Sequence, residues 1–286
     1  MQSLVGVLFD GFAYGMLLFL LSVGLSVTLG MMNFVNLAHC SFAMVGGYAM
    51  VSLMNQLGWP FFTALAAAFL AAAAVAVVLE RTLYRRLYRA SELDQCLFTI
   101  GIVFISVATF AWFYTTEQQS ARVPEYLRGA VQVMGINFAA YRIFLIAVSL
   151  CIVALLILLL ERTRFGATVR AAVDNQRMAR GLGIDVDRAF MITFALGGGL
   201  AGLGGGLAVE MVGLDPSFAF TYLVYVLIVV AVGGLGSIGG SFAAATVLGI
   251  SDMAGKYYFP WLGAFLIYLV MVALLMWRPA GLFGRR

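Results

Sequence analysis

The sequence has few charged residues for its length. Of its 286 residues, 63% are hydrophobic and only 10% are charged, whereas a soluble domain carries about 25% charged residues. Too few polar side chains are present to cover a surface that faces water. A lipid bilayer supplies an apolar solvent for such a composition, and each crossing helix needs roughly 20 apolar residues. The apolar runs are continuous rather than alternating, which excludes a transmembrane β-barrel.

Several kinds of chemical site are also missing. His39 is the only histidine, and Cys40, Cys96 and Cys151 all lie in or beside apolar runs. Neither a zinc site nor a disulfide framework is therefore expected. Lys256 is the only lysine, and it does not follow a glycine-rich loop as a phosphate-binding P-loop requires. We expect a chain that is not an enzyme, has no cofactor or metal of its own and binds no nucleic acid. If ATP drives it, another subunit binds the ATP and its Mg²⁺.

Long apolar stretches predict an all-α, polytopic transmembrane bundle of about 8–9 spans, forming a single domain over residues 1–286. The stretch 223–255 is too long for one crossing, and glycines within 233–240 interrupt it. We expect two short helices there, joined by a glycine turn. The predicted spans are 12–30, 41–56, 61–79, 93–113, 141–160, 190–212, 223–255 and 258–277.

The arginines predict the orientation of the chain. They cluster in 80–92, in 161–189 and in 278–286, and the positive-inside rule places these segments in the cytoplasm. The loop 114–140 carries two arginines that two glutamates balance, so it is expected in the periplasm. Counting crossings from these segments places the N-terminus in the periplasm and the C-terminus in the cytoplasm.

An internal repeat is suggested by the order of the segments. Residues 12–89 and 223–286 both run from a helix through a break to a short helix, a second helix and an arginine cluster. Both begin outside and end inside, which predicts a parallel repeat. A coincidence of hydropathy is the alternative, because the similarity between individual residues is weak.

A polar break interrupts the apolar pattern at 33–41. Unsatisfied polar groups are costly in hydrocarbon, and irregular backbone at membrane depth persists only inside protein or beside a cavity. A broken helix that lines a translocation path and an ordinary cytoplasmic turn both fit this segment. Its polar residues are Asn33, Asn36, His39 and Ser41.

The glycine-rich break at 233–240 contains Gly236 and Ser237. If the two halves form a repeat, the two breaks occupy matching positions and approach one another. We therefore predict that Gly236 and Ser237 line the same path as Asn36 and His39.

Glycines recur at four-residue spacing within 197–206. Small residues at this spacing let two membrane helices approach closely. We interpret the row Gly198, Gly202 and Gly206 as a helix-packing surface.

The stretch 161–189 contains a predicted amphipathic helix at 167–180, which Gly181 and Gly183 end. Such a helix lies on the lipid surface, connects two spans in water or docks into a soluble partner. Amphipathicity alone leaves all three explanations open.

Three ionisable residues lie in or near predicted spans: Asp94, Glu210 and Asp252. Charges within the membrane are functional candidates by default. All three are within reach of a span end, so extension of the side chain to water is the favoured interpretation.

Five motifs occur in order along nearly the whole chain. The first combines 24–30, 35–39 and 46–48, and the second lies in 166–185. The others are 194–202, 233–240 and 278–284. Together these motifs resemble the permease family of branched-chain amino acid ABC importers.

This resemblance implies an assembly in the membrane lipid of the bacterial inner membrane. Its members are this chain, a second related permease, two ABC ATPases and a periplasmic substrate-binding protein. It favours docking onto an ATPase for 161–189 and a path-lining role for 33–41. The residues that match the family's coupling segment are Gly166, Arg170, Ala171, Asn175, Ala179 and Gly183.

Cys40 departs from the resemblance, because the family usually has glycine after the Ala-His pair. The resemblance implies import of branched-chain or other hydrophobic amino acids. Urea, short amides and aromatic acids are alternative substrates within the same class. An ion-coupled secondary transporter is the alternative class, with only Glu210 and Asp252 as candidates for a coupling site.

The orientation can be tested with two single cysteines, Gln118→Cys and Gln176→Cys, in a version without native cysteines. An impermeant thiol reagent applied to whole cells should label the first and not the second, because only 114–140 is expected outside. The reverse labelling would contradict the orientation.

Overall fold

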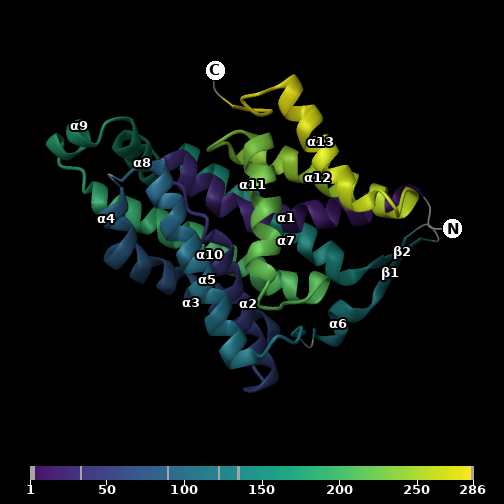
Figure 1. The fold of residues 1–286 in the computed structure, drawn as a ribbon. Helices are drawn as coiled ribbons and strands as arrows, with labels where there is room; N and C mark the ends of the chain where they lie inside the picture. The colour runs from purple at the N-terminus through teal and green to yellow at the C-terminus, as the bar shows by residue number, and fades with distance from the viewer. Residues whose placement is uncertain (1–3, 33, 89, 122, 134–135, 285–286) are drawn as a thin grey trace.

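The chain folds as a bundle of helices with one short β-hairpin (Figure 1). This computed structural model describes all residues except 1–3, 33, 89, 122, 134–135 and 285–286. Five of the described helices are long and apolar enough to cross a membrane, and two shorter apolar helices accompany them. The predicted helical membrane bundle is therefore confirmed. The main helices are α1 (Leu4–Met32), α2 (His39–Asn55), α3 (Phe61–Leu79), α5 (Glu92–Tyr114), α7 (Ala140–Ile157), α10 (Val186–Val212), α11 (Phe218–Gly233), α12 (Ile238–Tyr258) and α13 (Gly263–Trp277).

Shorter elements continue or connect these helices. Two π-helical turns extend α3 and α7, and a two-stranded antiparallel hairpin pairs Ala130 with Ala139 and Val133 with Ile136. The short elements are η1 (Glu80–Tyr84), α4 (Arg85–Leu87), α6 (Glu125–Arg128), β1 (Ala130–Val133), β2 (Ile136–Ala139), η2 (Leu158–Arg162), α8 (Arg164–Asp174) and α9 (Gln176–Gly181).

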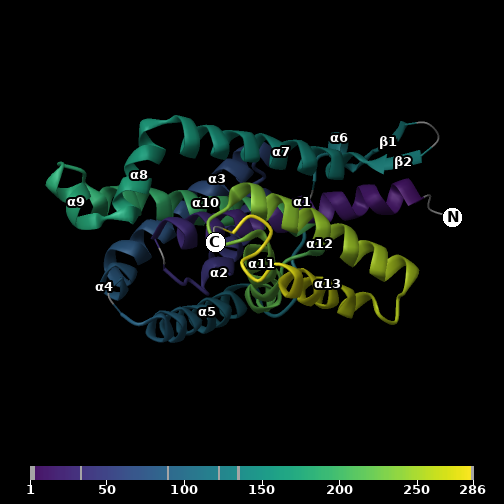
Figure 2. The same ribbon diagram turned by 90° about the horizontal axis from the view of Figure 1, so that it is seen from above.

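The two ends of the bundle differ in charge. Figures 1 and 2 show α4, α8 and α9 together at one end, with the start of α1 and the β1–β2 hairpin at the other. Phe9 of α1 packs edge-on against Phe138 of β2, with ring centroids 4.6 Å apart. The arginine-rich segments 80–92 and 161–189 thus share an end, and the hairpin of 114–140 is opposite. Which end faces the cytoplasm stays a prediction.

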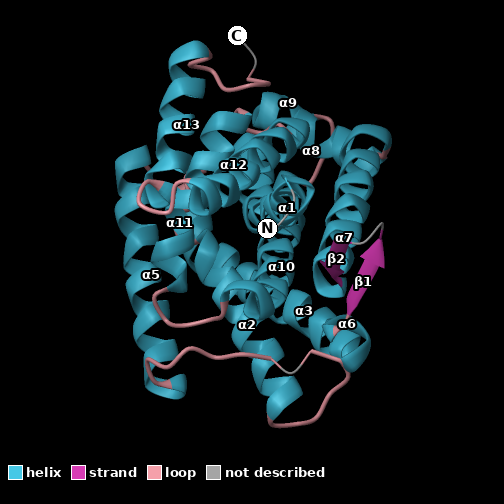
Figure 3. Cartoon of the chain, turned by 90° about the vertical axis from the view of Figure 1, so that its right-hand side faces the viewer, coloured by secondary structure: helices cyan, strands magenta, loops and turns pink. Residues whose placement is uncertain are grey.

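Helix α10 lies in the centre of the bundle and is mostly buried. It packs against α1, α2 and α3, and Figure 3, which looks roughly along α1, shows the other helices arranged around this centre. Each glycine of the row Gly198, Gly202 and Gly206 faces α3. A Cβ built on Gly198 would lie 2.5 Å from Ala76 Cβ, and one on Gly202 would overlap Ala72 Cβ.

Other glycines of α10 face different helices. A Cβ on Gly197 would lie 2.9 Å from the carbonyl oxygen of Gly24 in α1, and one on Gly205 would overlap the Ala43 backbone of α2. Because none of these positions has room for a side chain, the backbones approach one another closely. The mutual approach resembles the small-residue packing of membrane helices.

Some predicted helix boundaries were displaced. Helix α1 begins by Leu4 rather than at residue 12, and Asp10 within it forms an ion pair with Arg142 of α7. The paired carboxylate therefore does not interrupt the helix. The stretch 223–255 is divided as expected, into α11 and α12. The order of a helix, a break and two helices recurs in α1–α3 and α11–α13, but α1 has 29 residues and α11 has 16, and the internal repeat stays a prediction.

The glycine packing predicts a contrast between two Gly→Ala substitutions in helices. Gly202→Ala should destabilise the protein, because overpacking costs about 1–3 kcal/mol and Ala72 Cβ occupies the space. Gly101→Ala in α5 should be neutral or stabilising, because nothing lies within 4 Å of its Cβ position and alanine favours the helix. Thermal unfolding in detergent, followed by size-exclusion chromatography, measures both. Equal stability of the two variants would contradict this packing.

Candidate functional site

The first break lies between α1 and α2, at residues 34–38. Asn36 is buried, and its Oδ1 accepts a hydrogen bond from the Ala38 N–H at 3.1 Å. Its Nδ2 has no partner among the described residues. Asn33 lies outside the described residues. The local hydrogen bond is typical of asparagine, whose side chain competes with the helix for backbone groups.

Helix α5 supplies the partners that the backbone of this break needs. The Val35 N–H donates to Gln95 Oε1 at 3.0 Å, and the Leu37 N–H donates to Thr99 Oγ1 at 3.2 Å. Both α5 side chains are buried. Sequence analysis missed them, although two polar residues four apart in an apolar helix mark one face and were a visible signal.

His39 and Ser41 belong to the first turns of α2 rather than to the break. The His39 ring hydrogen-bonds to the backbone of Leu21 in α1, while its Nε2 has no partner among the described residues. Only glycine fits at position 24 of α1, opposite the His39 ring, because a Cβ on Gly24 would lie 2.8 Å from His39 Cε1. Ser41 Oγ hydrogen-bonds with Ser106 Oγ of α5 at 2.7 Å. Cys40, between them, is buried.

The second break is a turn at residues 234–237. Gly234 and Gly236 both have positive φ, of 95° and 77°, which glycine adopts without strain. Ser237 then begins α12, its Oγ accepting a hydrogen bond from the Gly240 N–H at 3.0 Å. Ser237 is therefore a helix cap as well as a candidate path residue.

The C-terminal segment folds back onto this second break. The Leu282 N–H donates to the Val232 carbonyl at 2.7 Å, and the Phe283 N–H donates to that of Gly233 at 3.2 Å. A Cβ on Gly281 would lie 2.6 Å from the Gly234 nitrogen. The motif at 278–284 is thus a clasp that satisfies the carbonyls at the end of α11.

Both breaks lie at the same end of α1. Gly30, in the last turn of α1, touches the second break, since a Cβ on Gly236 would lie 2.6 Å from Gly30 Cα. Asn36 and His39 are buried, whereas Gly236 is exposed. The structure brings the breaks together, but within a single chain these residues do not share one open surface. The shared path stays a prediction.

The segment 161–189 is folded more tightly than one amphipathic helix. The predicted helix at 167–180 is divided into α8 and α9, because Asn175 is extended and its Oδ1 caps α9 through the Met178 N–H at 3.0 Å. Asparagine favours this cap over the helix interior. Ala179 is buried, Ala171 is partly buried, and Gly183 has a φ of 83° that ends the segment.

The start of α8 is pressed against η2. A Cβ on Gly166 would overlap the backbone of Leu160, and the Arg170 guanidinium donates to the Leu160 carbonyl. Thr163 Oγ1 caps the helix by accepting from the Gly166 N–H at 3.3 Å. These contacts fix the angle at which α8 leaves the membrane helix α7.

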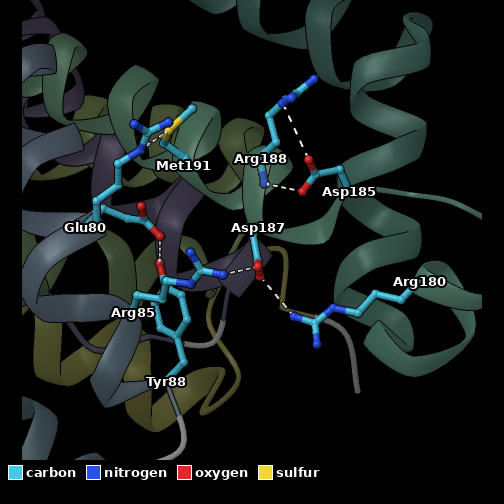
Figure 4. Close-up of polar contacts among 9 residues, drawn as sticks. Glu80, Arg85, Tyr88, Arg180, Asp185, Asp187, Arg188 and Met191 are labelled. Carbon is cyan, nitrogen blue, oxygen red and sulfur yellow. Dashed lines mark hydrogen bonds and ion pairs between the residues drawn. The ribbon is translucent and has the colours of Figure 1, made fainter.

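An aspartate joins this segment to the end of α3. Figure 4 shows Asp187, in the first turn of α10, between two arginines. It accepts hydrogen bonds from Arg85 of α4 and, at 3.0 Å, from Arg180 of α9. We name this group of three the Asp187 bridge. Exposed ion pairs contribute only about 0–1 kcal/mol to stability, so its effect is to position the segments.

A hollow of about 300 Å³ lies beside the Asp187 bridge. Asp185 caps α10 there by accepting from the Arg188 N–H at 2.9 Å, and Glu80 accepts from the Tyr88 hydroxyl at 2.9 Å. Sequence analysis used these arginines only as markers of orientation. It included Asp185 in the motif 166–185 but missed Asp187. The hollow is lined by Glu80, Arg81, Arg85, Asp185, Asp187, Arg188 and Met191.

Residues 7–275 match the family described as branched-chain amino acid transport system / permease component. The chain belongs to this permease family. The family consists of transport proteins, and the apolar helices of this chain form a multi-pass membrane protein.

Curated relatives of this permease extend over nearly its whole length. It is 27% identical to the probable branched-chain amino acid transport permease protein LivH of Methanocaldococcus jannaschii, over 95% of this chain and 90% of that protein. It is 24% identical to the high-affinity branched-chain amino acid transport system permease protein BraD of Pseudomonas aeruginosa, over 100% of this chain and 96% of BraD. The permease protein LivM of Escherichia coli is 26% identical, over 93% of this chain and 68% of LivM. No solved structure matches this permease.

Proposed function

We propose that this permease is one of the membrane-spanning subunits of an ABC importer that carries branched-chain amino acids into the cell. The observation that carries the proposal is the family match across residues 7–275, joined by relatives whose names specify transport of branched-chain amino acids. Urea, short amides, aromatic acids and ion-coupled transport have no counterpart in those names. Transport is then the task of this chain, and ATP hydrolysis that of its partners.

A second permease related to this one is the first partner. The chain matches both LivH and LivM of Escherichia coli, two permease proteins of a high-affinity branched-chain amino acid transport system. Two ABC ATPases, which hold ATP and Mg²⁺, and a periplasmic binding protein complete the proposed assembly in the cell membrane.

The segment 161–189 is the proposed docking site for the ATPase, on the cytoplasmic side. Its geometry suits force transfer, because α8 is braced against η2 and the Asp187 bridge ties α9 to α4. A push on α9 therefore reaches both α10 and the end of α3. In this orientation the start of α1 faces the periplasm and the C-terminal clasp faces the cytoplasm.

The translocation path is proposed to pass the two breaks beside Gly30. There the chain collects polar groups that hydrocarbon cannot satisfy, including Asn36 Nδ2 and His39 Nε2. The exposed turn at Gly236 gives the second permease access to the same region.

The coupling proposal is tested with Gly166→Ala and its matched control Gly181→Ala. A Cβ on Gly166 overlaps the Leu160 backbone, whereas nothing lies within 4 Å of one on Gly181. In liposomes that hold the complete importer, wild type should take up leucine only with ATP. Gly166→Ala should lower uptake, because overpacking that costs about 1–3 kcal/mol displaces α8 from η2, and Gly181→Ala should leave uptake unchanged.

The outcomes distinguish a failure of the proposed transporter class from a failure of the proposed docking role. Uptake by wild type without ATP or without the ATPases would contradict the proposed class. Normal uptake by Gly166→Ala, with normal ATPase binding, would contradict only the docking role of 161–189.

The path proposal is tested with Asn36→Leu and Ser237→Leu in the same importer. Each should block uptake or change substrate preference while the ATPases stay bound. Asn55→Leu is the matched control, because Asn55 is exposed at the other end of α2, where it donates to the Ser120 carbonyl. Unchanged uptake and preference in both path variants would mean that the breaks are turns only.

A further inference from the structure

Asp252 of α12 is a buried carboxylate with only one of its oxygens paired. Its side chain is 1% exposed. Oδ2 accepts from Lys256 Nζ at 2.6 Å, whereas Oδ1 has no partner in the part of the chain that the structure describes. A carboxylate buried among membrane helices is costly unless it is compensated. The expectation that Asp252 extends to water is wrong, because this side chain has no access to solvent.

Lys256, the only lysine of the chain, pairs with this buried carboxylate through a long, flexible side chain. Its side chain is 50% exposed, and its ammonium group also lies over the Tyr14 ring of α1, 5.5 Å from the centroid. A lysine has a flexible stem of four carbons, so Nζ can move into water. Asp252 cannot follow it, and its carboxylate then needs another cation.

Tyrosines of α1 and α11 lie near the Asp252 carboxylate: Tyr14, Tyr222 and Tyr225. Tyr268 of α13 stacks on Tyr225, with ring centroids 6.5 Å apart. The rings of Tyr222 and Tyr225 are 5.9 Å apart. Aromatic faces beside a carboxylate form the environment that binds an ammonium group, through cation–π attraction and charge pairing.

This group lies at the opposite end of α12 from the two breaks. Asp252 is roughly 22 Å along the helix from Ser237, at 1.5 Å per residue. Figure 3 shows α11, α12 and α13 on one side of α1. One helix therefore connects the tyrosine-lined carboxylate with the end at which the breaks meet Gly30.

We propose that Asp252 binds the α-ammonium group of the transported amino acid, which displaces Lys256 from the carboxylate. The inference rests on the proposed function and deepens it. It selects amino acids over urea, short amides and simple aromatic acids, because none of those solutes carries an ammonium group. In the absence of substrate, the Lys256 ammonium occupies the same position.

A purely structural ion pair is the competing explanation, since Lys256 lies in the last turn of α12, where a cation stabilises the helix end. The neutral double variant Asp252→Asn/Lys256→Met separates the two. Replacing both members of a buried pair is often neutral for stability. A structural pair predicts normal uptake in the double variant, and a binding carboxylate predicts that uptake is lost.

The experiment measures ATP-driven leucine uptake by the complete importer in liposomes. Asp252→Asn and the double variant should both lose uptake by about tenfold or more, the factor that 1.4 kcal/mol of lost binding energy gives. Size-exclusion chromatography and the ATPase rate without substrate verify assembly.

The matched control is the neutral double variant Asp10→Asn/Arg142→Gln. It removes a second ion pair near this end of the bundle, between α1 and α7, and should leave uptake unchanged. If wild type imports leucine and Asp252→Asn/Lys256→Met imports it equally well, the inference is overturned while the proposed function stands. If wild type imports no leucine, the proposed function itself fails.

Discussion

Lipid offers no hydrogen bonds, and this constraint accounts for how the chain departs from helical structure. Each break in a membrane helix frees backbone groups that only protein can satisfy. The break after α1 is satisfied by Gln95 and Thr99 of α5. The break after α11 is satisfied by the C-terminal clasp, which donates to the carbonyls of Val232 and Gly233. The breaks are therefore built into the fold, and their backbone is held in one arrangement.

Close packing in the centre sets what can move. Glycines of α10 bring its backbone against α1, α2 and α3, leaving no space for side chains between them. Such a centre transmits displacement rather than absorbing it, because packed interiors are hard to deform. The Asp187 bridge attaches the segment 161–189 to α10 and to the end of α3. A force applied at α9 would thus reach the helices beside both breaks.

Polar chemistry is concentrated at the two ends of α12. One end begins at Ser237, beside Gly30 and the first break, and the other holds Asp252 and Lys256 among tyrosines. Between them α12 lies tightly against α1, where a Cβ on Gly11 would lie 2.7 Å from Ile250 Cα. The α1 side of α12 therefore has no open space between the two polar regions.

The sequence by itself determined the class of this protein. Scarce charge and long apolar runs predict a helical membrane bundle, and ordered motifs indicate the permease family. The four-residue glycine spacing likewise marks a packing surface. It does not reveal that α3 is the helix that packs against this surface. These features are local or periodic along the chain, and a single segment is enough to display them.

Only the tertiary structure decided which groups meet. Gln95 lies 60 residues from the backbone group that it serves, and Arg85 lies 102 residues from Asp187. The division of 167–180 at Asn175 and the burial of Asp252 depend on neighbours in the same way. A hydrogen bond or ion pair between distant segments leaves no periodic pattern in the sequence, because its geometry exists only after the helices have packed.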